Sequence, residues 1–402
     1  MPGMPRPLLV EDYTMALPAA LIAVEDIDSD VDSFTNIQEI IAGSFPGDPF
    51  SNPEALECPE VGANEFYQVC QYDPEYTYRK VMLDFCGQSP SYDDLLSFRD
   101  LDTAEQLDAL DQVLDACLDS EFWLGKNGEL WQLAHRKIRP VGSLKSGEDS
   151  GSFPASDYYD DYNLFVWSQT DNRDSRELLL ADYFVSRTTS PTEYVMVDNL
   201  PGSQKMQVER RAGLLTTDWV SLYNIMFTAV PRTAAAQAYR AFLGYDIAKL
   251  EGLFPVSGEP KDYDDKGVAS PACAVCHSTL DPMTYPWTRF NGIQAPRGQY
   301  DPNRIIDDFL DEGVNIADMP ESGMLLGQPV VDLLDWAQVA ANSSQYASAT
   351  TEDYWRFLMG SGPSATEMTE FNGLWQGLMG LYEYSVERML HDLIKTEAYG
   401  AP

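Results

Sequence analysis

Cys273-Ala274-Val275-Cys276-His277 is the stretch that most restricts how this chain can be interpreted. Two cysteines separated by two residues, with a histidine directly after the second, form the attachment pattern of c-type haem. Both thiols then bond to vinyl groups of one porphyrin, and His277 becomes the proximal ligand of the iron. Zinc is disfavoured, because two further ligands at zinc-finger spacing are absent. A buried cysteine pair beside a capping histidine is the remaining alternative. The sequence therefore predicts one covalent haem c.

The other four cysteines agree with the compartment that this prediction implies. Thioether attachment of haem takes place outside the cytoplasm, so the chain is expected in the periplasm or at the cell surface. An even number of remaining cysteines in an exported chain favours two disulfides. We predict Cys58–Cys70 first and Cys86–Cys117 second, although four cysteines allow three pairings and the sequence does not choose among them. Four small buried thiols are the alternative.

The composition describes an acidic globular protein. With 402 residues, 44% of them hydrophobic, the chain can form two or three domains with packed cores. A formal net charge of −38 disfavours nucleic acid and anionic membranes as partners, since both attract cationic surfaces. No apolar run is long enough to span a membrane. The apolar segment Met15–Val24 lacks a preceding basic region, so a leader is expected to precede this numbering or to have been removed.

Helical periodicity dominates the chain after its first 75 residues. We predict a mainly α fold of multi-helix domains around a cytochrome-c-like haem-binding region: an irregular N-terminal arm (1–75), helical domains (76–145 and 146–260) and a haem-binding domain with C-terminal helices (261–402). Ser91 is expected to cap one helix with Asp94 at its third position, and Thr103–Gln106 to begin the next. Further helices are expected over 33–42, 163–186, 217–228, 233–251, 330–342, 351–359, 366–380 and 383–396.

Motifs outside residues 273–277 indicate a family. They are Tyr78–Gly87 followed by Pro90, Phe122-Trp123 and Trp131; Leu179–Tyr183; Arg211–Thr216 followed by Pro231-Arg232-Thr233 and Leu243-Gly244; Asp281-Pro282, Phe290 and Ile293 after His277; and Met389–Ile394 with Tyr399. In this order they resemble motifs of the large multidomain cytochromes c of planctomycetes and myxobacteria. The family motifs are RRLxLDLxGxxPT…W…W, LLTADYTF, RAGLLT…PTRT…LLG and CxxCHxxxDPxGxxxxxFDxxG, followed by a closing helix. In those proteins, domains of unknown function surround a single haem site.

The resemblance covers about residues 76–400 and implies haem c and a helical architecture rather than a particular reaction. The chain departs from the family pattern at two places within the haem region. Met283-Thr284 stands where the family has Leu-Gly, and Asn291-Gly292 where it has Asp-Ala. No second CxxCH domain precedes the body of the chain, as one does in some relatives.

The second axial ligand decides between an electron carrier and a catalyst, because an open position permits small-molecule chemistry. Met319 is our candidate, since a methionine followed by proline several tens of residues after the haem motif resembles the distal loop of small cytochromes c. Met324 is the nearest rival, and His135 is the bis-histidine candidate. An ordinary apolar loop residue, or for His135 a helix-capping role, is the alternative for each.

Other residues after the motif are candidates for contact with the porphyrin. Arg289 and Arg297 are expected to pair with the haem propionates, with a surface ion pair as the alternative. Tyr285, Trp287 and Phe290 are expected to pack on the porphyrin, with an ordinary aromatic core as the alternative.

Three functional hypotheses follow from these residues. The first is a single-haem c-type cytochrome that transfers electrons outside the cytoplasm to a redox protein partner or to neighbouring haem subunits, which can include a homo-oligomer. The second is a haem enzyme with an open distal site. The third is a structural or assembly subunit of an extracellular polymer that carries haem, with residues 1–75 as a connecting arm.

Overall fold

The computed structural model describes most of the chain after residue 71 and short segments before it. The described residues are 20–29, 31, 33–42, 46, 72–138, 159–189, 192–198, 206–310 and 315–401. Their packing divides the chain into two units, Met1–Tyr72 with Ala401 and Asp73–Gly400 with Pro402. Each unit is described by itself. The predicted Cys58–Cys70 disulfide lies outside the described residues, and the division of 76–402 into three domains stays a prediction.

The described part of the first unit contains two short helical segments, residues 20–24 and α2 (Asn36–Ala42). Asn36 Nδ2 donates a hydrogen bond to Val24 O at 2.7 Å, which links the two segments. Between them, the Asp28 carboxylate accepts from the backbone N–H groups of Val31 and Ser33 and fixes the turn. The short helix predicted within 33–42 is therefore present, beginning at Asn36.

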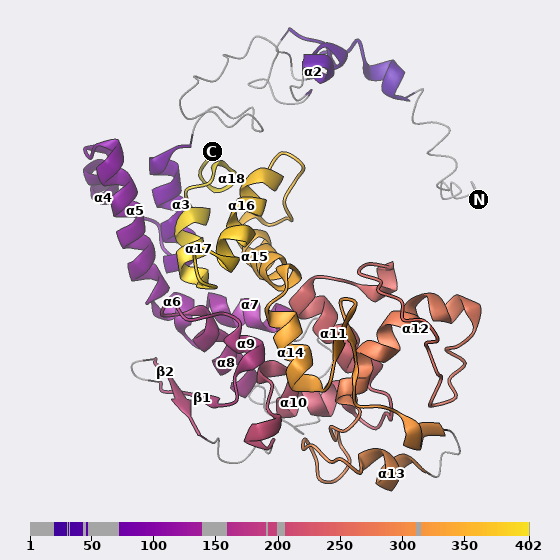
Figure 1. The fold of residues 1–402 in the computed structure, drawn as a ribbon. Coiled ribbons are helices and arrows are strands. Elements are labelled where there is room, and N and C mark those ends of the chain that lie inside the picture. Colours follow the sequence, from indigo (N-terminus) through magenta and orange to yellow (C-terminus); the bar gives the residue numbers. More distant parts are fainter. Residues whose placement is uncertain are drawn as a thin grey trace, which may run out of the picture. The chain divides into compact units, whose positions relative to one another are not determined.

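The second unit is mainly α-helical, as the sequence predicted (Figure 1). Its α-helices are α3 (Pro74–Cys86), α4 (Tyr92–Arg99), α5 (Thr103–Leu118), α6 (Glu121–Leu124), α7 (Glu129–Ile138), α8 (Tyr159–Gln169), α9 (Glu177–Leu180), α10 (Asp218–Val220), α11 (Arg232–Leu243), α12 (Pro271–Thr284), α13 (Arg304–Phe309), α14 (Leu333–Ala341), α15 (Ser344–Met359), α16 (Met368–Met379), α17 (Val386–Leu393) and α18 (Glu397–Gly400). Shorter helical turns are η2 (Val208–Arg210), η3 (Gly213–Thr216), η4 (Ser221–Ile225), η5 (Ile247–Lys249), η6 (Tyr285–Trp287) and η8 (Asn315–Asp318).

Two small antiparallel strand pairs complete the described part of this unit. They are β1 (Phe184–Arg187) with β2 (Tyr194–Val197), and β3 (Gly323–Leu325) with β4 (Gln328–Val330). Phe184 stands opposite Val197 in the first pair, and Gly323 stands opposite Val330 in the second. The first pair replaces the end of the helix predicted over 163–186, because the chain leaves α8 through Asp171 and Asn172, whose φ angles are positive.

Local signals set the ends of the first helices. Ser91 caps α4 and forms a reciprocal capping box with Asp94, as predicted. The next helix, α5, begins at Thr103 as predicted, and Asp102 is its N-cap and forms a capping box with Glu105. The predicted disulfide Cys86–Cys117 is confirmed and joins the C-terminal turns of α3 and α5.

The C-terminal helices close on these first helices, and Figure 1 shows α17 and α18 beside α3. The Tyr399 hydroxyl donates to Asp84 Oδ2 at 3.0 Å, and Lys80 Nζ donates to the Tyr399 carbonyl at 3.2 Å. His391 on α17 lies between Asp111 and Asp115 of α5, at 2.8 and 2.9 Å. The first and last motifs of the family resemblance therefore form one packed contact.

The two middle motifs also meet. Arg211 is buried; its Nε donates to the Tyr183 carbonyl at 2.7 Å and its Nη2 approaches Asp160 at 3.4 Å. Gly213 N–H donates to Ala181 O at 2.9 Å. A Cβ on Gly213, whose φ is +43°, would lie only 2.2 Å from Leu178 O. Glycine is therefore required where η3 crosses the segment after α9.

Candidate haem site

Helix α12 carries the three residues of the CxxCH motif and packs against α11 and β3 (Figure 1). Pro271 occupies its first turn, where the fixed φ of proline favours helix and its missing N–H is not needed. Cys273, Cys276 and His277 follow at positions i, i+3 and i+4, so they share one face of the helix. The local sequence therefore presents two thiols and one imidazole to the same side.

A proline inside α12 ties the helix to the preceding segment. Pro282 has no N–H to donate to Ser278 O, its partner in an ordinary helix. The Val256 N–H donates to that carbonyl instead, at 2.9 Å, and Phe254 N–H donates to Thr279 Oγ1 at 2.9 Å. On a neighbouring strand, a Cβ on Gly323 would lie 1.9 Å from Pro282 O, so the β3 backbone touches the helix directly. These contacts hold the CxxCH helix in place.

Both motif cysteines carry free thiols. Cys273 is exposed and Cys276 is half-buried, with its Sγ 3.7 Å from the carbonyl oxygen of Ile247 in η5. The two thiols thus differ from Cys86 and Cys117, which are bonded to each other. Two accessible thiols one helical turn apart are what covalent attachment of a porphyrin requires.

The His277 ring is held by a buried carboxylate on the next turn. Its Nδ1 lies 2.8 Å from Asp281 Oδ1, and the Asp281 side chain is only 2% exposed. Because Asp281 also binds Arg232 through both oxygens, it presents an acceptor to the ring, and Nδ1 is the donor. In that tautomer the second ring nitrogen, Nε2, is unprotonated and carries a lone pair that can bind a metal ion.

Arg232 at the start of α11 joins Asp281 to a second carboxylate. Its Nε and Nη2 donate to Asp281 at 2.7 and 2.8 Å, and its Nη1 and Nη2 donate to Asp264 at 2.7 and 2.9 Å. Burial alone would lower the pKa of the Arg232 guanidinium, but the hydrogen bonds and charges of the two carboxylates outweigh it and raise that pKa. We call His277, Asp281, Arg232 and Asp264 the proximal network.

The residues present fit a covalently attached haem. Cys273 and Cys276 supply free thiols with the right spacing, and His277 has a fixed tautomer with Nε2 available to the iron. Among the described residues, no group of three or more His, Cys, Asp and Glu side chains is placed to hold a metal ion by itself.

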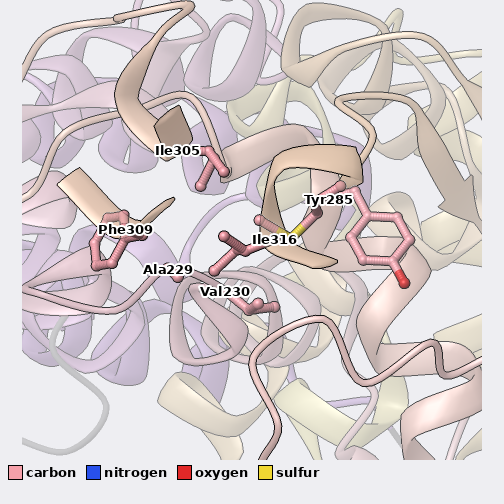
Figure 2. Close-up of a cluster of buried hydrophobic side chains, with 7 residues drawn as sticks. Ala229, Val230, Tyr285, Ile305, Phe309 and Ile316 are labelled. Atoms are coloured by element: carbon pink, nitrogen blue, oxygen red, sulfur yellow. The ribbon is translucent and has the colours of Figure 1, made fainter. Parts of the chain in front are cut away.

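Met319 lies in a buried apolar cluster with Ala229, Val230, Tyr285, Ile305, Phe309 and Ile316. Figure 2 shows the labelled members of this cluster, with the Tyr285 hydroxyl pointing away from the others. Met319 is 1% exposed, and its carbonyl accepts from Arg289 Nη2 at 2.9 Å. Its predicted role as the second axial ligand stays a prediction.

The two rival ligands have different surroundings. Met324 is half-buried on β3, whose backbone touches α12. His135 lies near the end of α7, and its Nδ1 is 2.7 Å from the Tyr162 hydroxyl. Met324 is therefore the rival whose strand directly contacts the helix that carries His277.

The three aromatic candidates are buried and have aromatic neighbours. Trp287 packs edge-on against Trp336, with ring centres 4.9 Å apart, and Phe290 packs against Tyr300 at 5.3 Å. The Tyr285 hydroxyl donates to Glu259 at 2.7 Å, and burial together with that carboxylate raises the pKa of Tyr285. These contacts place all three in the core around α12, and their contact with a porphyrin stays a prediction.

The two predicted propionate partners differ in their surroundings. Arg289 Nη1 is buried and has no hydrogen-bond partner among the described residues, while burial lowers the pKa of its guanidinium. A buried donor without a protein acceptor is suited to pairing with an anionic group. Arg297 is half-buried and forms no ion pair with a described residue. Arg289 is therefore the better supported of the two.

Sequence reasoning did not identify the proximal network behind His277. Asp281 could have been found, because a carboxylate four residues after a histidine lies beside it on a helix. Arg232 stood in one of the motifs but without a role. Asp264 gave no signal, since it is one of 64 acidic residues and lies in an acidic loop.

Comparisons with protein-family models, with curated proteins and with solved structures found no match to this chain. The family resemblance therefore depends on the motifs quoted above. No helix in the described part of the chain is long and apolar enough to cross a membrane.

Proposed function

We propose that this protein is a single-haem c-type cytochrome that carries electrons outside the cytoplasm. The observation that supports it most is the state of α12: two free thiols and a histidine share one face, and a buried carboxylate orients the histidine. A thiol redox pair has no need of a carboxylate that orients His277, and a zinc site would need two further ligands at zinc-finger spacing. Haem c, when bound, supplies a one-electron couple.

The residues of the chain have distinct roles in this proposal. Cys273 and Cys276 anchor the porphyrin, and His277 Nε2 binds the iron. Arg289 neutralises a propionate through its unpaired Nη1. Met319 would be the second residue that binds the iron, which would close the iron to small molecules and favour electron transfer over catalysis.

The proposed location and partners follow from the same features. The Cys86–Cys117 disulfide is of a kind that persists in oxidising compartments, which supports a periplasmic or cell-surface protein. One haem in a chain of this length needs a second haem nearby for long-range transfer. The proposed partner is therefore a redox protein or a neighbouring haem subunit, including another copy of this chain.

Covalent attachment is tested by mass. The protein is produced in a bacterial host with cytochrome c maturation, and its intact mass is measured under denaturing conditions together with a pyridine haemochrome spectrum. Wild type should carry one haem, and Cys273→Ala/Cys276→Ala should carry none. Cys86→Ala/Cys117→Ala is the matched control, because it also removes a cysteine pair but should keep the haem. A wild-type mass equal to that of the bare chain would overturn the proposal.

The distal side is tested by spectroscopy and carbon monoxide. Ferric wild type should show the weak charge-transfer band of His/Met haem near the red edge of the visible spectrum. The reduced protein should bind carbon monoxide slowly. Met319→Ala should lose the band and bind carbon monoxide rapidly while keeping the haem. An unchanged Met319→Ala spectrum would reject this ligand, and Met324→Ala and His135→Ala would then be measured. Rapid binding to wild type would favour the open-site enzyme.

A further inference from the structure

We infer that Asp281 is a positioning residue that sets the reduction potential of this site by holding His277 and increasing the basicity of its ring. The inference rests on the proposed haem function and goes beyond it, since it names what controls the potential.

The geometry gives Asp281 control of the ring. The 2.8 Å contact between Nδ1 and Oδ1 fixes which nitrogen carries the proton, and the carboxylate is itself fixed by Arg232. Asp281 is buried and lies on the same helix as His277, and it cannot rotate away without breaking its two bonds to Arg232. A histidine ligand that donates to a carboxylate is a stronger base toward its metal than one that donates to a carbonyl.

The charges of the proximal network strengthen this effect. Arg232 is the single cation of the network and is shared between two carboxylates, Asp281 and Asp264. The Asp264 side chain is 8% exposed, so water screens it only weakly. Two carboxylates against one guanidinium leave a net negative charge behind the proximal ligand. A negative charge at this position favours the ferric over the ferrous state and lowers the reduction potential.

The ferric–ferrous couple involves one electron and no other reactant. One electron enters from the redox partner proposed above, and no bond between the protein and the iron forms or breaks. The inference assigns the Nδ1 proton to the hydrogen bond between His277 and Asp281 in both oxidation states. Asp281 therefore acts through its charge and its hydrogen bond, and it needs no co-reactant.

The test is a series of charge-removing variants in the haem-loaded protein, with the midpoint potential measured by spectroelectrochemistry. Asp281→Asn keeps the shape and an acceptor for Nδ1 but removes the charge in direct contact with His277. Asp264→Asn removes a charge one step further away, behind Arg232. Asp265→Asn is the matched control, because Asp265 is the next residue but is exposed.

We expect the potential to rise in a fixed order. Asp281→Asn should shift the ferric–ferrous equilibrium toward the ferrous state by at least tenfold, which is about 59 mV for one electron. Asp264→Asn should give a smaller rise, and Asp265→Asn the smallest. Equal shifts in Asp281→Asn and Asp265→Asn would overturn the inference, because they would reduce it to a general charge effect.

The outcomes separate this inference from the function on which it rests. If wild type carries no haem, both are overturned. If wild type carries haem and the order of potentials is absent, only the role of Asp281 is overturned. If Asp281→Asn cannot be isolated, Asp264→Asn against Asp265→Asn decides, and a shift in Asp264→Asn no larger than the control rejects the inference.

Discussion

Removing the Cys86–Cys117 disulfide is expected to destabilise the helices around α3 and α5 by about 3.7 kcal/mol. The bond joins residues separated by 31 positions. In the chain-entropy treatment, a loop of that length lowers the entropy of the unfolded chain by about 12 cal/mol/K, which gives this free energy near 25 °C. Cys117 is fully buried, so loss of its sulfur also removes packing contacts.

Hydrogen exchange on Cys86→Ala/Cys117→Ala measures this loss where it occurs. Since each 1.4 kcal/mol is a factor of ten, the slowest amides of α5 should exchange roughly 400-fold faster than in wild type. The single variant Cys86→Ala breaks the bond but keeps the buried Cys117 side chain, so it separates the crosslink from the packing. Cys86→Ala should lose the free energy of the crosslink alone, and the double variant should lose more, because it also removes the buried Cys117 sulfur. A loss below about 1 kcal/mol in the double variant would refute the reasoning.

Two further substitutions test the packing of the middle of the chain. Gly213→Ala should destabilise by more than about 2 kcal/mol, because its Cβ would lie 2.2 Å from Leu178 O. Gly244→Ala, whose nearest atom is at 3.4 Å, should cost about 1 kcal/mol, and equal losses in thermal melts would contradict the clash. Burial, with repulsion from Asp160, raises the pKa of Asp161 well above its usual value. A carboxyl group whose pKa is raised in the folded state contributes stability that is fully present below about pH 3.9, the usual pKa of Asp in the unfolded chain. That stability is lost as the pH rises through the folded-state pKa. Asp161→Asn should therefore be more stable than wild type at pH 7 in urea titrations and equal to it at low pH; a less stable variant at pH 7 would contradict this.

The parts of the fold that the sequence predicted correctly are those set by nearby residues. The cap of α4 depends on Ser91 and Asp94, which are three positions apart. The helix predicted over 163–186 was wrong in its second half, because the direction of the chain there is decided at Asp171 and Asn172. The hydrophobic periodicity of the sequence does not indicate their left-handed conformations. These conformations depend on contacts with residues distant in the sequence, such as the Glu387 carboxylate, which accepts a hydrogen bond from Asn172 N–H.

In the candidate site, too, the residues that are close together in the sequence were predicted and those that are far apart were not. Cys273, Cys276 and His277 are close together in the sequence and their spacing alone indicates haem attachment, so the sequence was enough to propose them. The proximal network could not be assembled in the same way, because Arg232 lies 49 positions from Asp281 and 32 from Asp264. An acidic chain offers many carboxylates that are equally plausible partners for one arginine. The packing of α11 against α12 brings Asp281 to Arg232, and the loop before α12 brings Asp264 to it.

The placement of the basic residues bears on what this protein can bind. The chain has 26 Lys and Arg against 64 Asp and Glu. Several of its basic side chains are buried or ion-paired within the protein. Arg211 and Arg304 are at most 1% exposed, and Arg232 binds two carboxylates. Cations used in this way neutralise buried acids or bind carbonyls and leave the surface acids uncompensated. A surface of that kind repels polyanions and attracts a partner with a basic docking face, with an association rate that falls as salt is added. The proposed redox partner is therefore expected to be cationic around its own electron-transfer site.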